Sequence, residues 1–388
     1  EICACLVGSE MCIRDRNNMN PIKFACKKDE ICAAIGNVSK AVSPKSTITA
    51  LEGIRLLLNG TSLELTGYDL EIGITTVIEV DSEDRGEIVL NSRLFSEITR
   101  RMPSDTVCFE VDENLNMKIS GGNAQYQISA ISAEEYPALP DISRENGIFL
   151  NQEILKSMIN QTNYAVSLLD TKPILTGELF DIENGGFNMV AIDGFRLAIR
   201  HEKINASEKY YFVVPSKALM EASRLLKDDA ENDCEIYVDS KYVVIEVNGY
   251  RIFTRLLEGE FHAYKNSVPK DFTTEAIVNT SDIVHCLERC SLLLNEKNKA
   301  PVKCSFKDGQ IKVSCRTAIG RLEDSIPADI SGDEVLIGFN NKYLLDSLKA
   351  AETDKVRIRM TGSNRAVKIA PMEGDSFTFI VMPVQIKG

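Results

Sequence analysis

The sequence predicts an α+β protein that uses one structural unit three times. The first observation concerns turns: Asn-Gly or Asp-Gly pairs, which favour tight hairpin turns, lie between apolar runs. Their glycines, Gly60, Gly185 and Gly309, are 125 and 124 residues apart. Each pair is followed by residues that alternate between apolar and polar, as in a half-buried strand. A repeat of this size, with several hairpins in it, is a whole domain.

The second observation is that the same period recurs where an apolar strand gives way to an amphipathic helix. These transitions begin at Val89, Val213 and Ile337, each 124 residues after the previous one. We expect the second helix of each unit over residues 91–102, 215–227 and 340–349. Polar capping residues followed by apolar residues at helical spacing predict an opening helix near 29–42, 151–166 and 280–294. Each unit should pack its two helices on largely antiparallel sheet.

These repeats predict domain boundaries near residues 146 and 270, and therefore domains over 19–146, 147–270 and 271–388. Residues 1–18 interleave charges with short apolar pieces and lack the continuous apolar core of a secretory signal. The run from Cys5 to Arg16 is similar to a translated library adaptor, whereas Met19 has the setting of a natural start. We expect residues 1–18 to be a non-native extension outside the fold.

Composition limits the possible functions. With 44% apolar and 26% charged residues, and no apolar run near the roughly 18 that span a bilayer, a soluble cytoplasmic protein without membrane contact is expected. A net charge of −13 argues against a simple electrostatic nucleic-acid binder. The 11 cysteines are irregularly spaced and the three histidines scattered, so we expect reduced thiols, no metal site and no cofactor.

The segment 189–200 is a strand interrupted by Asp193 and Gly194, with Arg196 just beyond. An acid, a glycine and a cation at a strand end also occur in active sites, so a hydrolase or transferase using Asp193 and Arg196 is the alternative. The chain shows no nucleophile motif and no phosphate-binding loop to support it. Asp193 lies 124 residues after Asp69, so we expect a shared role in a local turn. Arg196, by contrast, has no counterpart in the other units, which indicates a unit-specific function.

The second helix of each unit carries unusual charge. Over the three predicted helices there are 8 basic and 3 acidic residues, within an acidic protein. For one helix, an ordinary solvated face is the simplest interpretation. Three equivalent helices favour contact with a phosphate backbone without base reading. Because Trp is absent and only Phe95 and Tyr343 are aromatic here, duplex is favoured over single strands stacked on rings.

Five segments carry a resemblance to a known family: Leu65–Glu71, Val190–Ala198, Leu294–Lys297, Ile337–Asn340 and Phe379–Pro383. Through them, residues 19–388 closely resemble the bacterial beta sliding clamps, the processivity subunits of DNA polymerase III. The resemblance implies three DNA-clamp domains that form half of a closed ring. Two chains would join head to tail around double-stranded DNA, with helices lining the hole. The implied role is non-catalytic tethering of the replicative polymerase.

The resemblance also implies a pocket for short linear peptides of the polymerase III alpha subunit, the clamp-loader delta subunit, other polymerases and repair proteins. One wall would comprise Leu175, Gly194, Phe195, Arg196 and Leu197, with Arg196 at the entrance. The other would comprise Asn340, Tyr343, Ile380, Val381, Met382 and Pro383, of which the last four should also form a strand. Phe195 stands where the family often has histidine and His262 where it often has proline, so peptide preference stays open.

Two further sets of residues follow. For DNA, matched positions indicate Lys45 and Arg93, and the repeat alone indicates Lys217 and Arg224. For a homodimer seam, the resemblance indicates Leu292 and Leu293 against Tyr126 and Ile128 of the other chain, core packing being the alternative for each. A scaffold protein that does not bind DNA is a third possibility. Retention on circular but not linear DNA separates it from a clamp.

Overall fold

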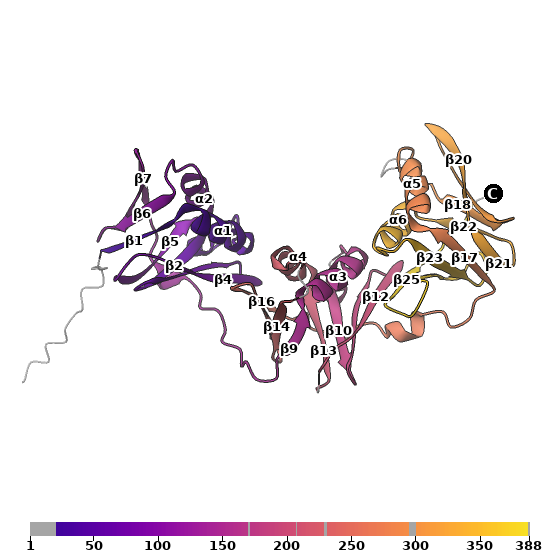
Figure 1. The fold of residues 1–388 in the computed structure, drawn as a ribbon, viewed down its shortest axis with the longest axis horizontal. Coiled ribbons are helices and arrows are strands. Elements are labelled where there is room, and N and C mark those ends of the chain that lie inside the picture. The colour runs from indigo at the N-terminus through magenta and orange to yellow at the C-terminus, as the bar shows by residue number, and fades with distance from the viewer. Residues whose placement is uncertain (1–20, 170, 207, 229–230, 295–299, 387–388) are drawn as a thin grey trace, which may run out of the picture. The chain divides into compact units, whose positions relative to one another are not determined.

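The computed structural model describes residues 21–169, 171–206, 208–228, 231–294 and 300–386. It divides into two compact units, residues 1–140 with 249–251 and residues 141–248 with 252–388. The expected extension over residues 1–18 lies outside the described residues. Figure 1 shows the helices and strands of both units.

The first unit holds one copy of the repeat. Its helices are α1 (Lys28–Val38) and α2 (Ser92–Arg100). Strands β1 (Ile22–Lys27), β6 (Thr106–Val111), β7 (Asn116–Gly121) and β8 (Ala124–Ser129) form one antiparallel sheet in the order β1-β6-β7-β8. Strands β2 (Gly53–Asn59), β3 (Ser62–Tyr68), β4 (Ile72–Glu79) and β5 (Arg85–Asn91) follow the order β5-β2-β3-β4.

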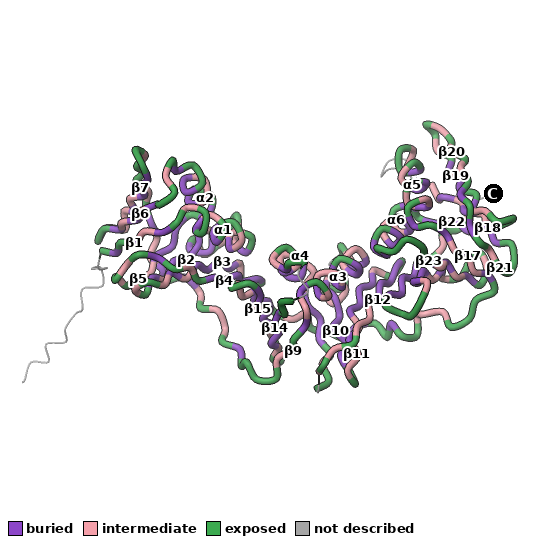
Figure 2. The backbone as a smooth tube through the Cα atoms, viewed as in Figure 1, coloured by how far each residue is buried: buried purple, intermediate pink, exposed green. Residues whose placement is uncertain are grey.

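The core of this unit lies between helices and sheets. Phe24 of β1 stacks on Phe109 of β6 with ring centroids 4.7 Å apart, and Phe95 of α2 meets Phe109 edge-on at 6.0 Å. All three residues are fully buried. Figure 2 colours the backbone of this unit by the burial of each residue. Helix α2 therefore forms because its apolar face covers aromatic strand residues, while its charged face stays in water.

The second unit holds two more copies. The central copy has helices α3 (Gln152–Thr162) and α4 (Ser216–Leu225). Its sheets follow the orders β9-β14-β15-β16 and β13-β10-β11-β12. The strands are β9 (Ile148–Asn151), β10 (Gly177–Glu183), β11 (Gly186–Ile192), β12 (Arg196–Lys203), β13 (Tyr210–Pro215), β14 (Asp233–Val238), β15 (Tyr242–Val247) and β16 (Tyr250–Arg255).

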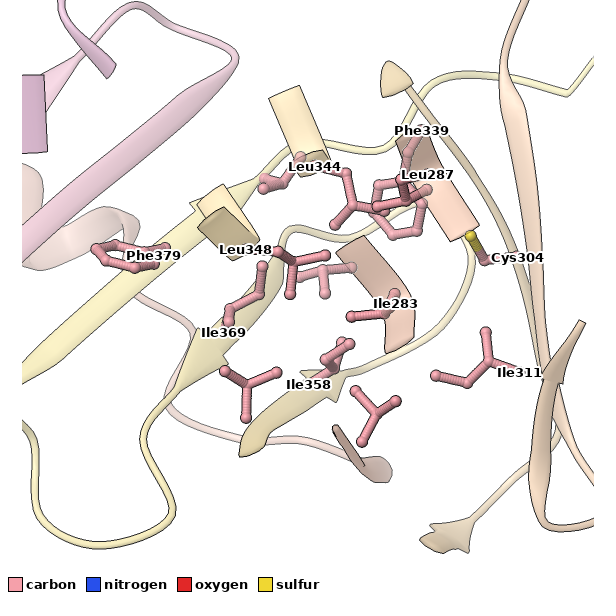
Figure 3. Packing of buried hydrophobic residues seen from close by; sticks show 14 of the residues in the cluster. Ile283, Leu287, Cys304, Ile311, Phe339, Leu344, Leu348, Ile358, Ile369 and Phe379 are labelled. Carbon is pink, nitrogen blue, oxygen red and sulfur yellow. The ribbon is translucent and has the colours of Figure 1, made fainter. Parts of the chain in front are cut away.

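The third copy has helices α5 (Thr280–Ser291) and α6 (Asn341–Lys349). Its sheets follow the orders β21-β17-β23-β24-β25 and β20-β19-β18-β22. The strands are β17 (Thr274–Asn279), β18 (Val302–Lys307), β19 (Gln310–Thr317), β20 (Gly320–Pro327), β21 (Asp329–Gly332), β22 (Val335–Phe339), β23 (Lys355–Met360), β24 (Val367–Ala370) and β25 (Phe377–Val381). The core of this copy packs α5 and α6 on the strands, as Figure 3 shows with Leu287, Leu348 and Ile358.

The central and third copies are joined through one sheet. Strand β12 pairs antiparallel with β25, with Leu197 opposite Ile380 and Ala198 opposite Phe379. The central residues Ala191 and Ala198 belong to the same buried cluster as the third copy's core. The prediction of a threefold α+β architecture with helices on antiparallel sheet is thereby confirmed.

Two of the three predicted turns have the expected backbone. Asn184-Gly185 and Asp308-Gly309 both adopt positive φ, at 53° and 76° and at 52° and 72°. The first turn differs, because Asn59 is a strand residue paired with Ser62 and the positive φ falls on Gly60. The predicted helices are shorter in the structure, since α1 and α3 pass into 3₁₀ turns at Ser39–Ala41 and Asn163–Ala165.

Candidate functional site

A cavity of about 540 Å³ opens in the second unit, where the central and third copies meet. Most of its apolar lining comes from aliphatic side chains, which suit a ligand with apolar groups. The central copy and the segment that follows it contribute Lys172, Ile174, Leu175, Ile192, Gly194, Arg196, Leu197, Glu260, Phe261, His262, Ala263 and Ser267. The third copy contributes Ile380 and Met382.

The β11–β12 connection is built around Asp193. Its Oδ1 accepts hydrogen bonds from the backbone N–H of Phe195 at 2.8 Å and of Arg196 at 3.0 Å. Gly194 takes a φ of 91°, which glycine adopts without the steric cost of a side chain. Asp193 therefore serves a local turn, as the repeat predicted. Its carboxylate is occupied with structural bonds, which leaves it poorly placed as a catalytic base.

The structure places Arg196 in the cavity wall with its side chain buried. Although it lines the cavity, its side chain is only 6% exposed. Its Nε contacts Asp193 Oδ2 at 2.9 Å, and its Nη1 contacts Asp346 Oδ2 on α6 at 2.7 Å. An uncompensated buried cation would be costly, so the guanidinium is held inward by these two carboxylates. The guanidinium is turned inward, and a role for Arg196 at the entrance of a peptide pocket stays a prediction.

The second wall comes from β25 and the residues after it. Ile380 is buried opposite Leu197, and Met382 is 41% exposed at the cavity. The Met382 backbone N–H donates to the Phe195 carbonyl at 2.8 Å, which extends the β12–β25 pairing by one bond. A flexible thioether at an apolar surface can adapt to varied ligands.

Six of the 11 predicted pocket residues line the cavity together: Leu175, Gly194, Arg196, Leu197, Ile380 and Met382. The other five lie around it. Phe195, 59% exposed, stacks on Tyr343 of α6 with centroids 5.9 Å apart. Asn340 caps α6 by accepting from the Lys342 N–H at 3.0 Å. Val381 is part of the buried core, and Pro383 is half-buried.

Sequence reasoning missed the cavity wall formed by residues 260–267. Phe261 is buried there, and Tyr264 anchors the wall by donating its hydroxyl hydrogen to Asp181 at 2.6 Å. His262 Nε2 lies 2.8 Å from Ser267 Oγ. This segment follows the last strand of the central copy and shows neither helical nor strand periodicity. The departure at His262 was the one signal in the sequence that pointed to it.

The predicted DNA-contact residues are all exposed. Arg93 and Lys217 lie in the first turns of α2 and α4, and Lys45 lies in the loop before Thr49–Glu52. Arg224, in the last turn of α4, forms an ion pair with Glu221. Arg101 follows the end of α2 and Lys227 that of α4, so the helices carry less positive charge than predicted.

The predicted seam residues occupy exposed or half-exposed positions. Tyr126 and Ile128 lie on β8, at the edge of its sheet in the first unit. In the second unit, Leu292 is 80% exposed, directly after α5. Leu293 packs partly against the third core and lies beside Gly320 of the edge strand β20. Core packing therefore describes Leu293 in part, but not Leu292.

The sequence matches three family models in chain order. They are the N-terminal, central and C-terminal domains of the DNA polymerase III beta subunit, over residues 22–140, 149–263 and 265–385. Together these models account for most of the chain, and each covers one copy of the repeat. The chain belongs to the DNA polymerase III beta subunit family.

Relatives agree with this assignment over their whole length. The beta sliding clamp of Bacillus subtilis is 34% identical over 377 residues, covering 94% of this chain and 100% of that protein. That of Staphylococcus epidermidis is 31% identical over 375 residues, covering 94% and 99%. Members of this family are processivity factors and not catalytic subunits, so a hydrolase or transferase role is set aside.

Solved structures show the same fold. The DNA polymerase sliding clamp from Bacillus subtilis superposes with a TM-score of 0.91 at 34% identity, covering 95% of this chain and 100% of that one. A putative DNA polymerase III beta subunit from Eubacterium rectale superposes with a TM-score of 0.90 at 31% identity, covering 94% of this chain and 99% of that one.

The helices were also compared with what a bilayer requires. Within the part of the chain that the structure describes, none combines the length and the apolar character of a membrane-spanning helix.

Proposed function

We propose that two copies of this chain close into a head-to-tail ring around double-stranded DNA and tether DNA polymerase III and other DNA-processing proteins. The observation that carries the proposal is the match of all three beta-subunit domains, in order, across the chain. In this proposal the domains span residues 19–146, 147–270 and 271–388, and the ring acts in the cytoplasm.

The sheet edges support a head-to-tail dimer. Within the second unit, the outer strand of one central sheet, β12, pairs with the outer strand of a third-domain sheet, β25. By position in the repeat, β20 corresponds to β12 and β8 corresponds to β25. Pairing of β20 with β8 of a second copy would repeat this join, bring Leu292 and Leu293 near Tyr126 and Ile128, and cover two strand edges.

The cavity supports the tethering role. Aliphatic walls with a few polar groups suit a short linear peptide that inserts apolar side chains. We propose that segments of the polymerase III alpha subunit, the clamp-loader delta subunit, other polymerases and repair proteins bind there in turn. Competition for one site would let a ring exchange partners without leaving DNA.

Weak contacts between exposed cations and DNA phosphates would allow the ring to slide. A ring retains DNA by topology, so its inner surface needs only weak phosphate contacts, and tight ion pairs would slow movement. Lys45, Arg93, Lys217 and Arg224 are exposed cations suited to such contact, and Arg224 also forms an ion pair with Glu221. Because the whole chain has a net charge of −13, the remaining surface is acidic, which favours solubility.

The test is retention on DNA of different topology. The protein is loaded by a bacterial clamp loader with ATP onto nicked circular duplex and passed through a sizing column at high salt. A ring should elute together with the circular DNA and should be lost from the DNA once a restriction enzyme linearises the circle. Equal retention on circular and linear DNA would show binding to the DNA surface without encirclement. Retention on neither form would show a protein that does not encircle DNA.

A further inference from the structure

The cavity wall contains a buried ionic bridge between two domains. Arg196 of the central domain contacts Asp193 in its own turn at 2.9 Å and Asp346 of the third domain at 2.7 Å. The Arg196 and Asp193 side chains are 6% and 11% exposed. One guanidinium thus joins carboxylates from both sides of the domain joint. In such surroundings a charged pair is screened little by solvent.

Aromatic rings complete the surroundings of this guanidinium. Its central carbon lies 4.6 Å from the Tyr343 ring centroid and 5.3 Å from that of Tyr164. Tyr343 belongs to α6 of the third domain and Tyr164 to the central domain, so the rings also come from both sides. A planar guanidinium can stack and bridge two carboxylates at once, whereas a lysine ammonium cannot do both.

The charges at the bridge balance through a second cation. Asp346 Oδ2 also accepts from Lys342 Nζ at 2.8 Å, and the Lys342 side chain is 72% exposed. Exposed ion pairs contribute little to stability, so Lys342 neutralises the second carboxylate but does not hold the two domains together. The Arg196–Asp346 contact is the more buried of the two ion pairs of Asp346, with side chains 6% and 21% exposed, so its loss leaves the Arg196 cation with Asp193 as its one remaining carboxylate of the two.

The bridge stands directly behind the peptide cavity. Arg196 lines it, whereas Asp346 does not. The same arginine begins β12 opposite Val381, next to the bond between the Met382 N–H and the Phe195 carbonyl. A change in the bridge therefore acts on Leu197 and on Met382, which belong to opposite walls of the cavity.

We propose that Arg196 and Asp346 are positioning residues that hold the two walls of the peptide pocket in register, so that Asp346 governs peptide affinity without contacting the peptide. This inference rests on the proposed function of the cavity. It changes the assignment of Arg196 from a ligand at the rim to a tie across the domain joint, and it adds Asp346 and Tyr164 to the residues on which the site depends.

The test begins with peptide affinity, measured by fluorescence anisotropy. The probe is a labelled peptide with a glutamine followed within a few residues by leucine and an aromatic residue. Asp346→Asn, which keeps the side-chain shape, should weaken binding at least tenfold. The matched control is Lys342→Ala, which removes the exposed partner of the same carboxylate and should change affinity less than twofold. Arg196→Lys should fall between the parent and Arg196→Met, because one ion pair can re-form without the bridge or the stacking.

A second measurement needs no ligand. Amide hydrogen exchange at Met382 and along β25 should speed up in Asp346→Asn, while exchange in β18 and β19 stays as in the parent. Faster exchange in Asp346→Asn together with unchanged peptide affinity would overturn the positioning role. A loss of peptide affinity in Arg196→Met without a loss in Asp346→Asn would overturn it as well. If the parent itself fails to bind the peptide, the proposed function of the cavity fails, and unchanged exchange in Asp346→Asn would independently remove the tie.

Discussion

Glu178 on β10 is a fully buried carboxyl group, and no ion pair to it is formed within the part of the chain that the structure describes. Its Oε1 accepts from Asn163 Nδ2 at 2.6 Å, and its Oε2 lies against the Thr162 hydroxyl. That hydroxyl is also 2.8 Å from the Met158 carbonyl and has only one hydrogen to donate. A protonated Glu178 resolves the conflict by donating to Thr162. Burial acts in the same direction and raises the pKa of Glu178 to about 7.

This pKa predicts how stability depends on pH. In the fold the neutral form is favoured, so the native state binds more protons than the unfolded chain between the ordinary carboxyl pKa and about 7. The free energy of unfolding should therefore decrease as pH rises through that window, by on the order of 3 kcal/mol for this group. Glu178→Gln should abolish that decrease, so urea midpoints of parent and variant should diverge from pH 5 to pH 8 in favour of the variant. Parallel midpoints would mean that the group is already ionised in the fold.

Two apolar side chains on opposite walls should dominate peptide affinity. Truncating a central anchor typically costs about 2 kcal/mol or more, so Met382→Ala or Leu175→Ala should weaken peptide binding at least roughly tenfold. The control is Val384→Ala: Val384 is 41% exposed, as Met382 is, but lies off the cavity. Anisotropy titrations measure all three variants. Parent-like affinity in both anchor variants would remove the peptide from this cavity.

For single residues, the residue type at the site was easier to predict from the sequence than the direction of its side chain. Arg196 stood out because the other repeats lack it, yet nothing in the spacing showed that Asp346, 150 residues later, would draw it inward. The aliphatic anchors Leu197 and Ile380 were identified through family resemblance. Ile192 and Phe261 also line the cavity, but apolar residues on or after a strand are typical of an ordinary core. Local spacing does not show that two domains meet there.

Among the elements, one turn recurs in all three domains with different chemistry. Asp69 Oδ1 accepts from the Glu71 and Ile72 N–H groups at 3.0 and 2.7 Å, as Asp193 does from its own successors. In the third domain the equivalent residue is Thr317, whose hydroxyl accepts from the Ile319 N–H at 3.3 Å. A short oxygen-bearing side chain is what the turn requires, so the acid recurs for structure and not for catalysis.

This comparison yields a prediction about Asp193. Asp193→Ala removes the turn bonds and also leaves the Arg196 cation short of a partner, which should cost about 3 kcal/mol or more. Asp239→Ala is the matched control, since Asp239 accepts from the Lys241 and Tyr242 N–H groups, both at 2.7 Å, in an exposed turn. That variant should cost about 1 kcal/mol. Urea unfolding measures both, and equal costs would show that the ionic bridge adds nothing to stability.

Helices and hairpins were predictable because their signals are local. Capping residues, apolar spacing and turn pairs each act over a few residues, and the repeat tested every prediction three times. Helix ends were less certain: α2 ends at Arg100 and α4 at Leu225, short of the predicted limits. The pairing of β12 with β25 lay beyond local reasoning, since it joins segments about 180 residues apart.

For the whole molecule, the exposed leucine after α5 predicts assembly. A protein with Leu292 in water and with β8 and β20 at the edges of their sheets should be a dimer at micromolar concentration by light scattering. Leu292→Asp with Leu293→Asp should convert it to a monomer. Leu168→Asp, at a still more exposed leucine of the central domain, should leave the mass unchanged. A monomeric parent would contradict the seam.

DNA contact is predicted to be weak and additive. Arg93→Glu with Lys217→Glu should reduce loading on duplex and lower the slope of log affinity against log salt by about 1 for each lost phosphate contact. Light scattering should show an intact dimer. Reversing both Lys209, paired with Glu183, and Lys307, paired with Glu334, gives the same change in net charge and serves as the control. A salt slope equal to that of the parent would place the DNA path on other residues.

The joint between the central and third domains also bears on how the protein is made. Leu175 and Leu197 leave the ribosome early, but the facing Ile380 and Met382 are synthesised only after nearly all of the third domain. A chain halted before Phe377 lacks Ile380 and Met382 of the second cavity wall and has no β25 to cover the edge of β12. Incomplete translation products should therefore be unable to compete with finished rings for the replication machinery, and their uncovered strand edge offers quality-control proteases a point of recognition.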